Sequence, residues 1–160
     1  RSLSEQQLVD CSGRYGNMGC NGGNMGNAFN YIKEQGLCED KNYPYKGAKS
    51  DCKASSCPTK FKINGYIPVT GDLIANALMA RPVSATVDAT NWQSYGGGIM
   101  KTCTSNLNHG VLVVGMQAQV WRVKNSWGNV WGEHGYIRLG PGDTCGYAEY
   151  AHILISDNIH

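Results

Sequence analysis

The sequence has little charge and no long hydrophobic run. Only 16% of its 160 residues are charged, and the formal net charge is +2. A net charge this small does not predict binding to nucleic acid or to a membrane surface. No apolar run approaches the roughly 20 residues of a transmembrane helix, and no signal peptide stands at the start. We therefore expect no nucleic-acid partner and no membrane partner.

Several ligand-binding motifs are also missing. The glycine-rich stretch 12–23 has no GxxxxGKS or GxxxxGKT pattern, so it does not predict phosphate binding. Cys52 and Cys57 are too far apart for a CxxC zinc knuckle, and no second pair of ligands follows at a suitable distance. We expect no metal and no cofactor. No N-x-Ser/Thr acceptor occurs, so N-glycosylation is not expected either.

Glycine and cysteine, in contrast, are abundant. The chain contains 21 glycines and seven cysteines, which indicates a compact, loop-rich protein of one or two small domains. Seven cysteines in so short a chain favour an oxidising compartment. Because the count is odd, one cysteine has no partner within the chain.

The first part of the chain predicts two helices. The first begins at Ser4, which has capping-box spacing to Gln7, and it ends at Cys11. The second begins at Asn24, and Gly36 follows its end as a C′ glycine. One face of the second helix is apolar and is formed by Met25, Ala28, Phe29 and Ile32.

The later part of the chain predicts mostly strands. Residues 37–60 have no periodic apolar pattern and are expected to be irregular and held by disulfides, whereas residues 61–69 are expected to be extended. Asp72 suits the cap of a short helix over residues 73–80, which Pro82 ends. Further strands are expected over residues 83–89, 111–114, 120–123, 135–139 and 151–156.

These elements divide the chain near residue 66. Residues 1–66 are expected to form a helical, disulfide-rich domain, and residues 67–160 a domain of mostly antiparallel strands. The predicted fold class is therefore α+β.

One histidine and one asparagine flank the central strand pair. His109 stands just before the strand over 111–114, and Asn125 just after the strand over 120–123. If the two strands are neighbours, both residues lie at one edge of the sheet, and Trp127 is close enough to cover a hydrogen bond between them. Such a bond would hold a catalytic imidazole in one tautomer. Taken singly, a histidine before a strand is more often structural, and an asparagine before Ser-Trp-Gly is more often a turn residue.

The combination of motifs is more specific than either residue. NHG at residues 108–110 and KNSWG at residues 124–128 resemble the histidine and asparagine regions of the papain-like cysteine proteases, with a cathepsin L-like character. Four further stretches match this family in its order along the chain: SEQQLVDCS at 4–12, GCNGG at 19–23, NYPY at 42–45 and WGEHGYIRL at 131–139.

The resemblance implies a papain-like two-domain fold, in which a helical domain and an antiparallel, β-barrel-like domain flank an active-site cleft. In this family the nucleophilic Cys lies in a CGSCW-type segment about 130–150 residues before the His. That spacing places it roughly 20 residues before Arg1, and none of the seven cysteines has such a context. We therefore expect that the N-terminal part is missing and that this chain alone is inactive.

The resemblance also implies a mechanism for the parent protein. A Cys thiolate would pair with His109, Asn125 would orient the imidazole, and Trp127 would keep water from their hydrogen bond. Asn108 stands where many members have Asp, which we interpret as tuning of the active site. The alternative is a catalytically silent or repurposed relative, with Ser for Cys or with a binding or structural role.

Further positions follow from the resemblance. The backbone at Gly22 and Gly23 would approach a peptide or protein substrate, and Gly23 would exchange main-chain hydrogen bonds with it. An apolar P2 side chain is expected, although Glu149 could admit a basic one if the register slips by one residue. The expected substrate-binding residues, beyond these two glycines, are Asn24, Met25, Thr86, Leu107, Gly110, Trp131 and Tyr150.

The cysteines are also assigned by resemblance. Cys11 would pair with Cys52, and Cys103 with Cys145, whereas Cys20 would pair with a cysteine of the missing N-terminal segment or light chain. Cys38 and Cys57 are left over, and the sequence does not decide whether they form a further bridge. The implied location is lysosomal, vacuolar or secreted, and protein inhibitors are possible partners.

Overall fold

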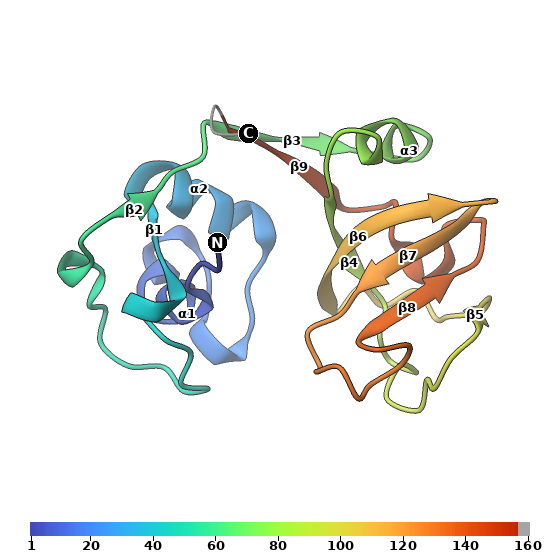
Figure 1. Ribbon diagram of the computed structural model, residues 1–160, viewed down its shortest axis with the longest axis horizontal. Coiled ribbons are helices and arrows are strands. Elements are labelled where there is room, and N and C mark those ends of the chain that lie inside the picture. Colours follow the sequence, from blue (N-terminus) through green and yellow to red (C-terminus); the bar gives the residue numbers. More distant parts are fainter. Residues whose placement is uncertain (157–160) are drawn as a thin grey trace. The chain divides into compact units, whose positions relative to one another are not determined.

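The computed structural model describes residues 1–156, which form two compact units (Figure 1). The first unit contains Arg1–Tyr66 together with residues 154–156, and the second contains Ile67–Ile153. The helices of the first unit and the large, mostly antiparallel sheet confirm the α+β class. Residues 157–160 of the expected second domain lie outside the described residues. The longest helix within residues 1–156 has 11 residues, and no helix there is long and apolar enough to span a membrane.

The first unit is built on two capped helices. Helix α1 (Glu5–Cys11) begins where the Ser4 hydroxyl accepts a hydrogen bond from the Gln7 N–H at 3.0 Å. Helix α2 (Met25–Gln35) begins at Asn24, which caps it in the same way. Each cap satisfies an N–H group that has no partner within its helix. Single turns of 3-10 helix lie at Ser12–Tyr15, Gly19–Asn21, Asp40–Asn42 and Ala54–Ser56.

Polar side chains complete the small core of this unit. Tyr31, Ile32 and Leu37 are its buried hydrophobic residues. The Gln7 amide is fully buried and donates hydrogen bonds to Tyr31 Oη and to the Gly36 carbonyl oxygen. Two disulfides, Cys11–Cys52 and Cys38–Cys57, cross-link the unit. Because a core this small buries little apolar area, cross-links and satisfied polar groups carry much of its stability.

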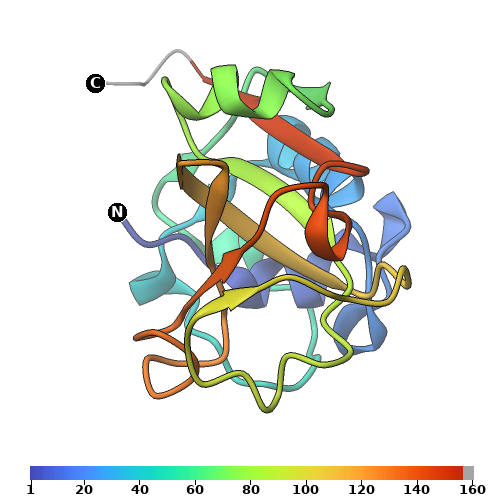
Figure 2. The ribbon, with the colours of Figure 1, turned by 90° about the vertical axis from the view of Figure 1, so that its right-hand side faces the viewer.

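The second unit is organised around strands β4 (Val83–Val87), β6 (His109–Gln117), β7 (Val120–Lys124) and β8 (Tyr136–Leu139) (Figure 2). They are neighbours in a seven-stranded sheet of order β3-β9-β4-β6-β7-β8-β5, in which β5 runs parallel to β8. The other elements are β3 (Gly65–Val69), α3 (Leu73–Leu78), β5 (Ile99–Met100), a 3-10 turn at Thr144–Gly146 and β9 (Ala151–Ile155).

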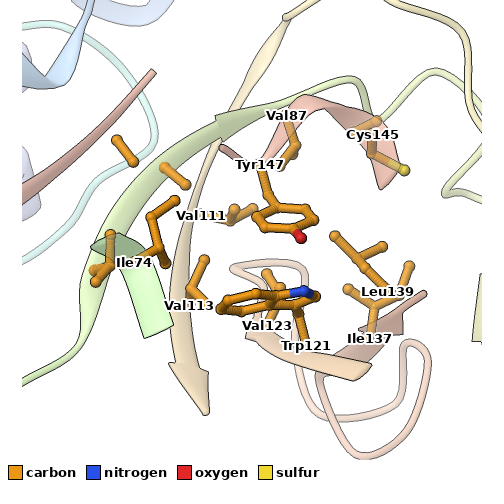
Figure 3. Close-up of a cluster of buried hydrophobic side chains, with 14 of the residues drawn as sticks. Ile74, Val87, Val111, Val113, Trp121, Val123, Ile137, Leu139, Cys145 and Tyr147 are labelled. Atoms are coloured by element: carbon orange, nitrogen blue, oxygen red, sulfur yellow. The ribbon is translucent and has the colours of Figure 1, made fainter. Parts of the chain in front are cut away.

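The alternating strands place one face of the sheet in a hydrophobic core. Along β4, Val83, Ala85 and Val87 are fully buried, while the residues between them are half-buried. Figure 3 shows Trp121 and Tyr147 facing one another within this core, with ring centroids 4.8 Å apart. Val87, the register partner of His109, and Val111 belong to the same core, so packing also supports the end of β6 that carries His109.

The structure corrects several expected boundaries. The stretch 37–60 is not wholly irregular, because β1 (Leu37–Cys38) pairs with β2 (Lys60–Phe61). The expected extended segment over 61–69 is divided between β2 and β3. Helix α3 ends at Leu78, and Asp72 does not cap it, because the backbone of Asp72 is itself helical and its side chain makes no cap hydrogen bond.

The strand that carries His109 is longer than its apolar run. It begins at His109 itself and continues to Gln117, because β6 and β7 stay paired up to a tight turn. Ala118 and Gln119 form this turn, both with positive φ, as the favoured two-residue hairpin turns require. Smaller corrections concern β4, which stops at Val87, and β8 and β9, which are each one residue shorter than expected.

Candidate active site

His109 and Asn125 lie at the same edge of the sheet. His109 is the first residue of β6 and pairs with Val87 of β4, and Asn125 directly follows β7. Strands β6 and β7 are antiparallel neighbours, so the start of one lies beside the end of the other. Asn125 is held in place by its backbone N–H, which donates to the Gly135 carbonyl oxygen at 3.0 Å.

The two side chains are joined by one hydrogen bond. His109 Nε2 lies 2.7 Å from Asn125 Oδ1. The backbone N–H of Ser126 donates to the same oxygen at 2.8 Å, so this atom is the carbonyl oxygen of the amide and Nε2 carries the proton. The second ring nitrogen, Nδ1, is therefore the unprotonated one in the neutral ring. Asn125 Nδ2 is buried and has no hydrogen-bond partner within residues 1–156.

Aromatic rings surround this pair. The Trp127 ring lies 5.1 Å from the His109 imidazole, centroid to centroid, and is partly exposed. Trp92 is fully buried and meets the imidazole edge-on at 6.2 Å. Trp131 stacks on Trp92 and donates its indole N–H to the Trp92 carbonyl oxygen at 2.8 Å. The imidazole thus has an apolar surrounding, which strengthens the hydrogen bond to Asn125.

Sequence reasoning did not single out Trp92. It lies 17 residues before His109, in a stretch with no periodic pattern, and only the tertiary structure brings its ring beside the imidazole. Trp131 was expected to be a substrate-binding residue. Its indole N–H already donates a hydrogen bond inside the aromatic cluster, to the Trp92 carbonyl oxygen.

Within residues 1–156, the hydrogen bonds of Asn108 go to the turn after β4 and not to the imidazole. Its side-chain oxygen accepts from the Ala89 N–H at 2.9 Å, and its amide nitrogen donates to Thr90 Oγ1 at 3.1 Å. Its backbone N–H donates to the Val87 carbonyl oxygen at 2.9 Å. Asn108, the residue that precedes His109, is therefore fixed to the turn after β4.

Asp88 is a second residue that sequence reasoning missed. Its carboxylate is buried within this same turn. Hydrogen bonds from the Thr104 and Thr90 hydroxyls hold the pKa of Asp88 well below its ordinary range. In the sequence, the only indication of this role is that Thr and Asn residues lie close to Asp88. Such residues are common in loops, so this pattern alone does not predict a buried carboxylate.

Five of the expected substrate-binding residues belong to the second unit. One of them, Trp131, is part of the aromatic cluster described above. Thr86 pairs with Gly110 across β4 and β6, and its backbone N–H donates to the Tyr150 carbonyl oxygen at 2.9 Å. Leu107 is half-buried and packs so closely over Gly146 that a Cβ on that glycine would lie 2.7 Å from the leucine side chain. Thr86, Gly110 and Tyr150 are therefore direct neighbours.

The other expected substrate-binding residues belong to the first unit and follow one another in the chain. Gly22 has a positive φ of 127°, a backbone conformation suited to glycine. A Cβ on Gly23 would lie 2.5 Å from Asn17 Oδ1, and that oxygen accepts the backbone N–H of Asn24. Gly23 thus has an internal steric reason to be glycine, in addition to the expected approach of a substrate. Asn24 and Met25 cap and begin α2.

Six of the seven cysteines are paired. Both pairings implied by the resemblance are present, Cys11–Cys52 and Cys103–Cys145. The two cysteines left open by the sequence, Cys38 and Cys57, form the third bridge. Within the described chain, Cys20 is the free cysteine and is exposed. No group of three or more His, Cys, Asp or Glu side chains in residues 1–156 could hold a metal ion.

Comparison with known proteins gives one consistent result. A family model described as papain family cysteine protease matches residues 1–155. Cathepsin L 2 of Paramecium tetraurelia is 51% identical over 146 residues, which are 90% of this chain and 46% of that protein. A cathepsin L-like proteinase of Phaedon cochleariae is 44% identical over an alignment 162 residues long, gaps included, that covers 93% of this chain and 50% of that protein.

Solved structures share the fold. The Carica candamarcensis cysteine protease CMS1MS2, in complex with E-64, matches with a TM-score of 0.92 at 34% identity, over 98% of this chain and 78% of that one. The bromelain protease of Ananas comosus matches with a TM-score of 0.89 at 35% identity, over 98% and 79%. The papain-like fold is thereby confirmed. The chain spans about half the length of the curated relatives named above.

Proposed function

The chain belongs to the papain family of cysteine proteases, and from that membership we propose that it is the larger, C-terminal part of a cysteine endopeptidase. The observation that carries the proposal is the hydrogen bond between His109 Nε2 and Asn125 Oδ1, at 2.7 Å and beside Trp127. It leaves His109 Nδ1 free to face a thiol.

In the proposed reaction the nucleophile is a thiolate that forms an ion pair with the His109 imidazolium. The thiolate attacks the peptide carbonyl carbon, and His109 donates its Nδ1 proton to the leaving amine as the acyl-enzyme forms. His109 then takes a proton from water as the water oxygen attacks the acyl-enzyme. This step releases the carboxylic acid and the thiolate and restores the ion pair with the imidazolium. Asn125 is neutral, so it orients the ring without removing the imidazolium charge.

The nucleophile is proposed to come from a segment outside this sequence. Cysteines in disulfides are not nucleophiles in this reaction, and six of the seven are so bonded. The free, exposed Cys20 is proposed to bond to a cysteine of that segment, either a light chain or the missing N-terminal part. On this proposal the isolated chain is inactive. The groups that would donate hydrogen bonds to the oxyanion of the tetrahedral intermediate are also proposed to lie in the missing segment.

The proposed substrate is a peptide or protein with an apolar P2 side chain. The register of Thr86 with Gly110 and the hydrogen bond from Thr86 to Tyr150 support a common subsite for these residues. Leu107 would add apolar surface to it. Three disulfides support an oxidising location, lysosomal, vacuolar or secreted. Protein inhibitors of the same enzymes are proposed as further partners.

The experiment is peptidase activity of the complete protein with and without a thiol-directed covalent inhibitor. His109→Ala is expected to lower kcat about 1,000-fold, the middle of the 10²- to 10⁴-fold range that general acid–base catalysis contributes. His134→Asn is the matched control, because His134 is exposed and has a positive φ of 56° that Asn tolerates. It is expected to keep full activity.

Unchanged turnover after His109→Ala would refute the proposed site. A Ser in place of the nucleophilic Cys, with no thiol-dependent activity, would instead establish the silent or repurposed relative. Sequencing of the complete protein decides between these outcomes.

A further inference from the structure

The buried carboxylate of Asp88 accepts four hydrogen bonds close to the start of β6. Asp88 follows the last residue of β4, Val87, and Val87 is the register partner of His109. Only 1% of Asp88 is exposed. A carboxylate is costly to bury unless hydrogen bonds replace its hydration, so its partners identify what the residue does.

The carboxylate joins two segments of chain. Oδ1 accepts from the Thr90 backbone N–H at 3.0 Å and from the Thr90 hydroxyl at 2.5 Å. Oδ2 accepts from the Asn106 backbone N–H at 3.1 Å and from the Thr104 hydroxyl. One side chain therefore closes the turn after β4 and also holds residues 104–106, the segment that leads into His109.

A second set of bonds continues from this point to His109. Thr90 Oγ1, which donates to Asp88, also accepts from the Asn108 amide nitrogen at 3.1 Å. Asn108 in turn bonds to the Ala89 N–H and to the Val87 carbonyl oxygen. The residue immediately before His109 is thus fixed from both its side chain and its backbone.

The far end of the segment is fixed as well. The Asp88 backbone N–H donates to the Cys145 carbonyl oxygen at 2.8 Å. Cys145 is bonded to Cys103, the residue before Thr104. The 103–108 segment is therefore held at Cys103 by the disulfide, and at Thr104 and Asn106 by the Asp88 carboxylate. Its last residue, Asn108, is held by the turn after β4.

We propose that Asp88 is a positioning residue for His109: its carboxylate holds the 104–108 segment so that the imidazole stays in line with Asn125. Asp88 acts through this segment and does not itself contact the reacting atoms. The inference rests on the proposed function, because it assigns Asp88 a part in the turnover attributed to His109.

The replacement Asp88→Asn tests this in the complete protein. A carboxamide has one oxygen and one NH₂ group, and it accepts only at the oxygen. Hydroxyls such as that of Thr104 can rotate to accept, but backbone N–H groups cannot. In either orientation the new NH₂ group therefore faces a backbone N–H, either that of Thr90 or that of Asn106. The hydrogen bond from that N–H is lost, and one of the two segments is no longer held.

The expected result is a lower kcat with little change in KM. A misplacement of about 1 Å can cost about 100-fold in rate, so we expect partial loosening to lower kcat about tenfold, with KM changed less than about twofold. Rates are measured per active site, titrated with a covalent thiol reagent, so that a loss of folded molecules does not count as a loss of turnover.

Asp10→Asn is the matched control. Asp10 is a second buried carboxylate with four hydrogen bonds, from Gln6, Tyr43 and twice from Ser50. Asp10 and these three partners all belong to the first unit, whereas the 104–108 segment belongs to the second. We expect kcat per titrated site to stay within about twofold, since none of its partners holds His109.

Two less disruptive variants at Thr104 test the same inference if Asp88→Asn does not fold. Thr104→Val removes one hydroxyl and is expected to lower kcat about threefold, whereas Thr104→Ser keeps the hydroxyl and is expected to restore it. Wild-type kcat in Asp88→Asn, or in Thr104→Val where Asp88→Asn does not fold, overturns the inference. So does an equal loss in Asp10→Asn. If the unaltered complete protein has no thiol-dependent activity, the proposed function itself fails, which is a separate result.

Discussion

The His109 imidazole has two ring nitrogens, and only one of them is bonded to Asn125. Nε2 is held by Asn125 Oδ1, and this oxygen also accepts the Ser126 N–H. Two donors on one carbonyl oxygen fix the amide, and the amide fixes the tautomer of the ring. Nδ1 is then available for proton transfer, which is the chemical requirement of the proposed reaction.

At this residue scale, Asn125→Ala is expected to slow the complete enzyme less than His109→Ala does. The imidazole would remain but lose its orientation, and misplacement of a catalytic group by about 1 Å costs about 100-fold. Steady-state kcat is the measurement. Asn76→Ala, an exposed change on α3, is the control and should have no effect. A kcat loss as complete as that of His109→Ala would mean that Asn125 does more than orient the ring.

At the scale of elements, the turn before β8 carries a partly exposed ion pair with two hydrogen bonds. Arg138 on β8 donates to Glu133 through two nitrogens, at 2.7 and 2.9 Å. The backbone of Glu133 also bonds to Tyr136 in both directions, and its carboxylate accepts from the Gly98 N–H. The Arg138 hydrogen bond lowers the pKa of Glu133 from 4.5 to about 2.

This lowered pKa predicts how stability depends on pH. The folded state binds the Glu133 proton less tightly than the unfolded state does, so the ionised carboxylate stabilises the fold. This contribution to stability is fully present above pH 4.5 and is lost as the pH falls towards 2. Glu133→Gln is expected to cost about 0.5–1 kcal/mol at pH 6, because the pair is partly exposed. The difference from wild type should shrink between pH 4.5 and 2. Denaturant unfolding at several pH values measures it, and a constant difference would contradict the assignment.

The elements also show which parts of the site were predictable. The β-branched runs over 111–114 and 120–123 predicted the strand pair, and the pair alone brings His109 and Asn125 to one edge. The lengths of the strands were not predictable from apolar runs. Strand β6 continues through Gly115, Met116 and Gln117 because β7 supplies hydrogen-bond partners there, and pairing does not depend on hydrophobicity.

At the scale of the whole molecule, the free cysteine predicts a second covalent partner. Intact mass of the source protein is expected to fall on reduction by the mass of a released peptide, if the light chain is separate. Cys20→Ser should abolish this link, whereas the three internal disulfides remain. Mass spectrometry before and after reduction, with sequencing of the released peptide, is the measurement. One continuous longer chain would exclude a separate light chain, and the absence of any further residues would exclude the enzyme.

The family, the α+β class and the placement of His109 beside Asn125 could be predicted from the sequence. They follow from local patterns: β-branched runs, motif order, and residues directly adjoining two neighbouring strands. The partners of Asp88, the position of Trp92 and the pairing of Cys38 with Cys57 are visible only in the folded chain. Asp88 and Asn106 are 18 residues apart. Contacts at such separations depend on strand register and on the turn after β4, and no local pattern in the chain specifies them.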